Sequence, residues 1–168
     1  MACDFAPMDD PVSIGEAGAH ELEAVRRLFR DYAGTLPFDL AYQGFEQELA
    51  GLPQPYAAPT GVLLVARDGR ARVLGTVGVK RLQDDIAEIK RLYVDPAGRG
   101  RGIGQALLES AIASAARLHY SRVRLDSHRP SMAAAIALYR RLGFAEIEPY
   151  GAKPSPDADM CFFERALP

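Results

Sequence analysis

The chain has 168 residues, a length that suits one domain of ordinary size with most of its apolar surface buried. Its formal net charge is −2 and its pI is near 5.9, so we expect no broad basic face for nucleic acid. Two cysteines cannot form a disulfide framework, the N-terminus lacks a signal-peptide pattern, and no apolar run approaches the ~20 residues that span a bilayer. We therefore expect a cytoplasmic protein of bacterial style with no membrane or nucleic-acid partner, whose first ~10 residues form a flexible tail.

The first half of the chain predicts two helical segments and an antiparallel meander. Hydrophobic spacing and turn residues give these elements in chain order: a strand at 12–14, helices at 20–32 and 43–52, and strands at 61–66, 73–81 and 86–94. A proline-broken turn at 36–39 separates the two helices, and a proline-rich loop at 53–59 follows them.

The second half alternates helices and strands. The expected elements are a helix at 103–118, a strand at 122–126, a helix capped by Ser131 and closed by Gly143, and a last strand at 160–164. This order after a meander predicts an α/β fold with a mixed central sheet flanked by helices. No repeat or linker divides the chain, so we expect a single domain over residues 1–168.

The segment between the strand at 86–94 and the following helix carries the clearest functional signal. Glycines occupy every second position, with Arg99 and Arg101 between them: Gly98, Gly100, Gly102 and Gly104. Glycines let a ligand approach the backbone, and the start of a helix offers unpaired N–H groups. Two arginines can bind phosphate bidentately. The segment predicts a polyphosphate cradle; the alternative is a flexible, solvated connection.

Spacing argues against two common phosphate loops. The dinucleotide pattern G-x-G-x-x-G fails because Ile103, Gln105 and Leu107 stand where its last glycine is required. The nucleoside-triphosphate loop needs Gly-Lys-Ser/Thr, and no lysine occurs between Lys90 and Lys153. A nucleotide-binding protein that uses this loop is therefore disfavoured.

Three motifs together resemble the GNAT superfamily of acetyl-CoA-dependent N-acetyltransferases. Arg99-x-x-Gly102-x-Gly104 matches that family's Arg/Gln-x-x-Gly-x-Gly/Ala pattern. The strand from Glu88 to Val94 resembles its fourth strand, and residues 137–144 (Ala-Leu-Tyr-Arg-Arg-Leu-Gly-Phe) resemble its second signature, a helix ending in Leu/Tyr-x-x-x-Gly-Phe. The similarity covers residues 62–144. It implies a GNAT fold, in which the parallel strands after the meander are splayed at the cofactor site.

The resemblance implies acetyl-CoA as co-substrate. Its pantetheine arm would lie between the strand that ends at Val94 and the strand that begins at Arg122, with the N–H of Leu92 or Tyr93 facing the thioester oxygen. The residues expected to bind it are Leu92, Tyr93, Val94, Arg99, Gly100, Arg101, Gly102, Ile103, Gly104, Gln105 and Met132. Many relatives have an asparagine at the place of Met132, so a polar contact from this residue is in doubt.

Two residues are candidates for proton transfer. The resemblance implies that Tyr139 donates a proton or hydrogen bond to the CoA sulfur; alternatively its ring packs in the apolar stripe of its helix. Glu88 is the candidate base, or else one half of a solvated pair with Lys90. Simple alternation places Glu88, Lys90, Leu92 and Val94 on one face, and the β-bulge that the family usually has near Leu92 would change this parity.

The acceptor site is the least defined part. By position we expect Phe38, Tyr42 and Phe45 on one side of it and Tyr150 opposite. The Asp-Ser-His run at 126–128 is too local for a catalytic triad, and the three histidines lack metal-ligand spacing, so we expect no metal. The resemblance implies direct attack by a primary amine of a small molecule or protein in a ternary complex, and a possible homodimer. The alternative is a CoA-binding sensor without turnover.

Overall fold

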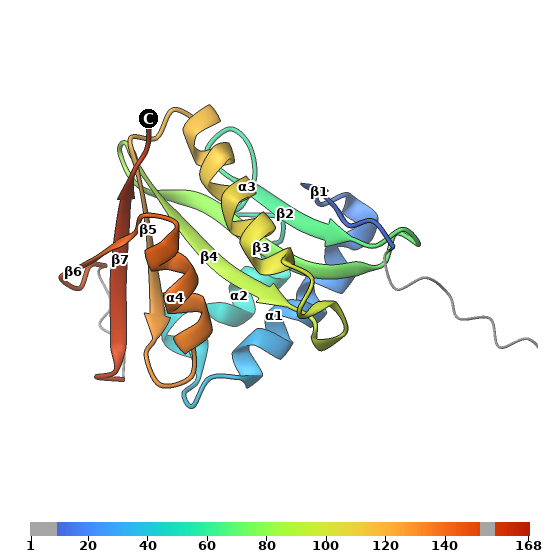
Figure 1. Ribbon diagram of the computed structural model, residues 1–168, viewed down its shortest axis with the longest axis horizontal. Coiled ribbons are helices and arrows are strands. Elements are labelled where there is room, and N and C mark those ends of the chain that lie inside the picture. The colour runs from blue at the N-terminus through green and yellow to red at the C-terminus, as the bar shows by residue number, and fades with distance from the viewer. Residues whose placement is uncertain (1–9, 152–156) are drawn as a thin grey trace, which may run out of the picture.

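The central strands are apolar on both faces, and helices cover both faces (Figure 1). In β2 (Val62–Arg67), Leu64 belongs to the core cluster under α3 (Ile103–Arg117), whereas Leu63 and Val65 belong to the cluster that includes α1 (Leu22–Gly34). A continuous apolar run thus marks a strand buried between two layers. The computed structural model describes residues 10–151 and 157–168; the N-terminal tail expected from the sequence lies outside these ranges.

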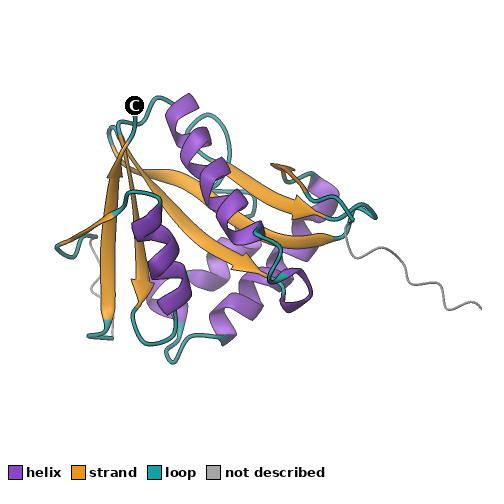
Figure 2. Cartoon of the chain, viewed as in Figure 1, coloured by secondary structure: helices purple, strands orange, loops and turns teal. Residues whose placement is uncertain are grey.

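Figure 2 shows the helices in purple against the orange sheet. The remaining elements are β1 (Ser13–Glu16), α2 (Phe45–Gly51), β3 (Val73–Gln83), β4 (Ile86–Val94), β5 (Arg122–His128), α4 (Ala133–Arg141), β6 (Ala145–Ile147) and β7 (Met160–Ala166), with short 3-10 helices at Ala19–Glu21, Leu40–Gln43 and Pro96–Gly98. No helix in the described ranges is long and apolar enough to cross a membrane.

Two local features differ from the sequence-based prediction. Strand β6 was not expected, because three residues are too short to show a period. The predicted cap at Ser131 is wrong: Met132 is the N-cap of α4. The Ser131 hydroxyl lies 2.7 Å from His128 Nδ1 instead, so a contact with the end of β5 replaces the cap.

The strand order is β1-β2-β3-β4-β5-β7-β6, and β4 and β5 are the parallel neighbours. They pair only where Ile86–Glu88 face Arg122–Arg124, and beyond these residues the two strands diverge (Figure 1). β3 continues to pair with β4 as far as Val94, and β7 pairs with all of β5. The predicted mixed sheet with splayed parallel strands is confirmed.

An extra residue in β4 changes which face its side chains take. Gly78 of β3 pairs with Lys90, and Thr76 pairs with Tyr93, so two steps on β3 face three steps on β4. Arg91 lies within this β-bulge with a φ of 61°, in the left-handed region that non-glycine residues rarely adopt.

The bulge corrects the simple alternation. Leu92 and Val94 pack against the α3 cluster, whereas Tyr93 packs against the cluster of α1 and α2. Glu88 shares a cavity with residues of the second layer, so Leu92 and Val94 lie on the opposite face from Glu88. The extra residue therefore separates the predicted base from the side chains of the predicted cofactor-binding segment.

Candidate active site

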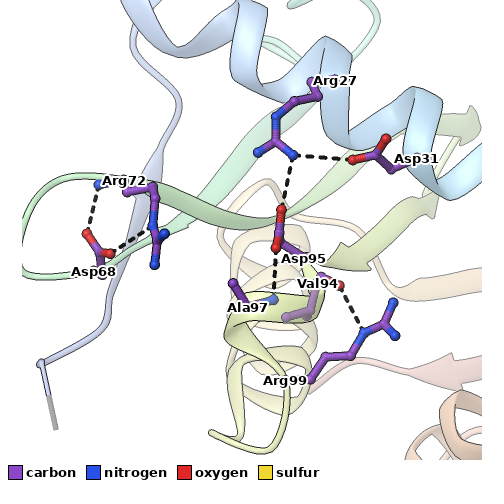
Figure 3. A network of polar contacts seen from close by, with 8 residues as sticks. All are labelled: Arg27, Asp31, Asp68, Arg72, Val94, Asp95, Ala97 and Arg99. Atoms are coloured by element: carbon purple, nitrogen blue, oxygen red, sulfur yellow. Dashed lines mark hydrogen bonds and ion pairs between the residues drawn. The ribbon is translucent and has the colours of Figure 1, made fainter. Parts of the chain in front are cut away.

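The turn that follows β4 is fixed by polar contacts with α1 (Figure 3). Asp95 accepts hydrogen bonds from the N–H of Ala97 at 2.9 Å and from Arg27 Nη1 at 3.0 Å, and Arg27 also pairs with Asp31. The Ala97 N–H and the Arg27 guanidinium lower the pKa of Asp95. The carboxylate therefore stays ionised at neutral pH, and it sets the direction in which the chain enters the glycine-rich loop.

The loop has a left-handed conformation at two glycines before α3 begins. Gly100 has a φ of 77°, and Gly102, the N-cap of α3, has a φ of 71°. A Cβ at either position would meet nothing within 4 Å, so both glycines border open space. The N–H groups of the first helical turn have no intrahelical partner. Backbone donors and free space are therefore adjacent, as a bound anion requires.

The two arginines of the loop point to different places. Arg99 Nε donates to the carbonyl oxygen of Val94 at 3.4 Å, and its guanidinium carbon lies 5.8 Å from the centre of the Tyr93 ring. Arg101 donates to the carbonyl oxygen of Asp10, away from the diverging strands. Only Arg99 of this pair lines the cavity described next.

A cavity of about 580 Å³, the donor cleft, lies between β4 and β5 where they diverge. Residues expected at the cofactor contribute to its lining: Leu92, Tyr93, Val94, Arg99, Gly104 and Met132. Other residues expected there do not: Gly100, Arg101, Gly102, Ile103 and Gln105. Ile103 is buried in the core and Gln105 donates to Glu109, so their side chains are engaged elsewhere.

Tyr139 reaches the donor cleft from α4 and also belongs to the core. Its ring centre lies 6.0 Å from that of Phe144 and 5.8 Å from that of Phe163, so the packing role considered from the sequence is present. Burial and then the neighbouring Tyr32 raise the pKa of Tyr139, while a hydrogen bond with Ser127 lowers it. Burial likewise raises the pKa of Tyr32, on the α1 side of the cleft, to about 12. Both phenols therefore keep their protons at neutral pH.

A second cavity of about 300 Å³, the acceptor cavity, shares Lys90, Arg91 and Asp126 with the donor cleft. Its lining includes Tyr42, Glu48, Lys80, Glu88 and Tyr150. Of the four aromatic residues expected at the acceptor, Tyr42 and Tyr150 thus line a cavity. Phe45 is buried in the core, and Phe38 packs on Tyr42 and on His128 with ring centres 6.3 and 5.6 Å apart.

Glu88 is buried between two lysines. Its Oε1 lies 3.6 Å from Lys80 Nζ and 3.8 Å from Lys90 Nζ, and the residue is only 6% exposed. The pair with Lys90 therefore exists, but it is shielded from water. Glu88 lines the acceptor cavity and not the donor cleft.

Arg91 is a site residue that sequence reasoning missed. Its Nε lies 2.8 Å from Glu48 Oε2, its Nη2 donates to Glu48 Oε1 at 3.1 Å and to Gln43 Oε1 at 2.9 Å, and the residue is 3% exposed. Its guanidinium carbon lies 5.8 and 5.3 Å from the ring centres of Tyr32 and Phe45. Burial opposes the charge, but the Glu48 hydrogen bonds raise the pKa of Arg91. The signal in the sequence was an arginine directly after Lys90, which breaks the alternation of apolar and charged residues in the strand.

The Asp-Ser-His run at 126–128 does not form a triad. Ser127 Oγ lies 3.0 Å from Met132 Sδ, and His128 Nδ1 contacts the Ser131 hydroxyl. Because Ser127 and His128 are directed to different partners, no histidine activates the serine as a nucleophile. The run ends β5, as the sequence suggested.

Three possible metal ligands meet beside the end of β5. His128, Asp157 and Asp159 each offer one atom, and these atoms lie within 4.8 Å of one another. His128 Nε2 lies 3.3 Å from Asp157 Oδ2, a contact that an ordinary hydrogen-bonded pair also makes. The expectation that the protein binds no metal stays a prediction.

The sheet thus splays at β4 and β5 over a cavity, next to a glycine-rich loop and the start of α3. The model of the acetyltransferase (GNAT) family matches residues 22–144, and the chain belongs to this family. An uncharacterised N-acetyltransferase of Schizosaccharomyces pombe is 35% identical over 138 residues, which cover 82% of this chain and 84% of that protein.

Solved structures share the fold. An acetyltransferase of the GNAT family from Staphylococcus aureus Mu50 has a TM-score of 0.77 at 23% identity and covers 94% of this chain and 100% of its own. A GNAT superfamily phosphinothricin acetyltransferase from Sinorhizobium meliloti, solved in complex with acetyl-CoA, has a TM-score of 0.71 at 24% identity, with 93% and 88% covered. The expected family and fold are thereby confirmed.

The ion pair at the bulge gives a stability prediction. Glu48→Gln removes the carboxylate that compensates the buried Arg91 guanidinium, so the free energy of unfolding should fall by about 3 kcal/mol. Urea denaturation measures this change. Glu46→Gln is the matched control, an exposed position of the same helix, and should change stability by less than about 0.5 kcal/mol. Equal stability of the two variants would contradict the role given to the ion pair.

Proposed function

We propose that the protein transfers the acetyl group of acetyl-CoA to a primary amine of a small molecule or protein, by direct attack in a ternary complex. The observation that carries this proposal is the donor cleft, where the open edge of β4 and the Tyr139 side chain meet. Membership of the acetyltransferase family and the relative solved with acetyl-CoA support the choice of donor.

On the donor side, the backbone of β4 supplies most of the contacts. Residues 92–94 have no β5 partner, so their outer peptide groups are available to an extended pantetheine arm, which would bind as an added strand. The N–H of Leu92 or Tyr93 would hydrogen-bond the thioester oxygen and stabilise its developing charge. The N–H groups of residues 99–104, with the Arg99 guanidinium, would bind the pyrophosphate.

Starting from the ammonium, the nitrogen loses two protons on the way to the amide and the departing sulfur gains one; the second nitrogen proton restores the Tyr139 phenol after that phenol has protonated the thiolate. The nitrogen lone pair forms a bond to the thioester carbonyl carbon, and the carbon–sulfur bond breaks. Glu88 accepts the proton of the incoming ammonium, directly or through water, from its place in the acceptor cavity. Tyr139 donates its phenolic proton to the departing thiolate, because burial keeps that phenol protonated. Tyr42 and Tyr150 flank the amine.

Thiol release from acetyl-CoA across a panel of amines tests this function. We expect thiol and N-acetylated product in equal amounts with at least one primary amine. Acetyl-CoA binding by calorimetry without thiol release from any amine would instead support a sensor that binds CoA without turnover.

The role of Tyr139 gives a kinetic prediction. Tyr139→Phe keeps the ring but removes the proton donor, so kcat should fall by about 100-fold or more while the dissociation constant of acetyl-CoA stays unchanged. Tyr120→Phe is the matched control: it removes a buried hydroxyl that donates to the Thr60 carbonyl, outside both cavities. An unchanged kcat in Tyr139→Phe would leave the residue with its packing role alone.

The glycine loop gives a binding prediction. Gly102→Val places a β-branched side chain in the open space beside the start of α3 and strains the left-handed backbone, so calorimetry should show acetyl-CoA affinity reduced at least about tenfold. Gly44→Val is the matched control, since Gly44 is also a left-handed helix N-cap, with φ of 72°, but begins α2. If both variants bind acetyl-CoA equally well, the cradle is placed wrongly.

A further inference from the structure

Asp126, a carboxylate at the junction of the two cavities, has no partner among the described residues. It belongs to β5 just beyond Arg124, the last residue that pairs with β4, and it lines both the donor cleft and the acceptor cavity. Within residues 10–151 and 157–168 it makes no hydrogen bond or ion pair. The other two carboxylates of the acceptor cavity are paired, Glu48 with Arg91 and Glu88 with lysines.

Asp126 shares its surroundings with three phenols as well as with Lys90 and Arg91. It lines the donor cleft with Tyr32 and Tyr139 and the acceptor cavity with Tyr150, and its charge adds to the rise in the pKa of each phenol, which burial dominates. The Tyr150 hydroxyl is buried and has no partner at hydrogen-bond distance in the described part of the chain, although the Glu88 carboxylate is near enough to raise its pKa. A partly buried carboxylate beside an unsatisfied hydroxyl is costly unless a ligand completes the site.

Two lysines, Lys80 of β3 and Lys90 of β4, also line the acceptor cavity. Lys80 and Lys90 together carry two charges, and Glu88 between them carries one of opposite sign. The Arg91–Glu48 pair is neutral as a unit. The cavity therefore presents a surplus positive charge on β3 and β4 and a negative charge on β5, where it meets the donor cleft.

We propose that the acceptor is a small zwitterion of amino-acid type, whose ammonium group binds the Asp126 carboxylate and whose carboxylate binds the ammonium groups of Lys80 and Lys90. This inference rests on the proposed acetyl transfer and names its acceptor class. Binding at Asp126 places the nitrogen at the junction with the donor cleft, which is where attack on a thioester requires it. A volume of about 300 Å³ suits a single small molecule. Asp126 positions the amine, and Glu88, which lies between the two lysines that bind the carboxylate, takes the amine proton through water.

The test compares free amino acids with their amides in the thiol-release assay. The standard protein amino acids are offered as free acids, as amides and as the decarboxylated amines. We expect a preferred free acid with a KM at least about tenfold below those of its amide and its amine, since one charged hydrogen bond is lost in each. Lys80→Met should reduce this preference severalfold.

Asp126→Asn tests the ammonium end. We expect the KM of the preferred amino acid to rise at least about tenfold, with the acetyl-CoA dissociation constant and the urea midpoint unchanged. Asp84→Asn is the matched control: it removes one negative charge from the exposed β3–β4 turn and should leave KM unaltered.

The outcomes separate the two proposals. If amides and simple amines react as well as the free acids, or if Asp126→Asn keeps the KM of the native protein, the zwitterion assignment is overturned while acetyl transfer stands. If acetyl-CoA binds and no amine of any class releases thiol, the proposed function itself fails. A low KM for free acids that Asp126→Asn raises, with donor affinity retained, supports both.

Discussion

The backbone of β4 beyond Glu88 pairs with β3 on one side and with no strand on the other. Buried peptide groups normally have partners on both sides, so an open edge in the middle of a sheet is a strong constraint on what must lie beside it. On one side of the gap, β4 is paired with β3. On the other side, every residue of β5 is paired with β7. The gap is thus a rigid part of the fold, and the whole donor site depends on it.

The bulge at Arg91 determines what each side of that gap contains. It places Leu92 and Val94 against the α3 layer while Glu88 lies on the opposite face. The left-handed backbone conformation of Arg91 is unfavourable for a residue with a side chain. The bidentate contact of its guanidinium with Glu48, and the neighbouring rings of Tyr32 and Phe45, stabilise this conformation. One buried ion pair therefore links α2 to the strand that would bind the donor.

The two sides of the site rely on different chemistry. The donor cleft offers backbone groups and protonated phenols, which suit a long, mostly neutral arm and its thioester. The acceptor cavity offers charged groups of both signs from several strands and from α2. Backbone recognition leaves a short local motif in the sequence. Recognition by side chains from distant elements leaves no short motif. The motifs therefore indicated the donor but gave no information about the acceptor.

The sequence by itself determined the order of helices and strands, the mixed sheet and the glycine-rich loop, because hydrophobic period and turn residues act over a few neighbours. It also placed Tyr139 and Glu88 in recognisable motifs. Only the tertiary structure decided that Arg101 turns away while Arg99 lines the cleft, that Arg91 is buried against Glu48, and that Asp126 has no partner within residues 10–151 and 157–168. These contacts depend on which face each side chain takes after the bulge and on partners more than thirty residues away, as with Arg91 and Glu48. A local sequence pattern contains neither piece of information.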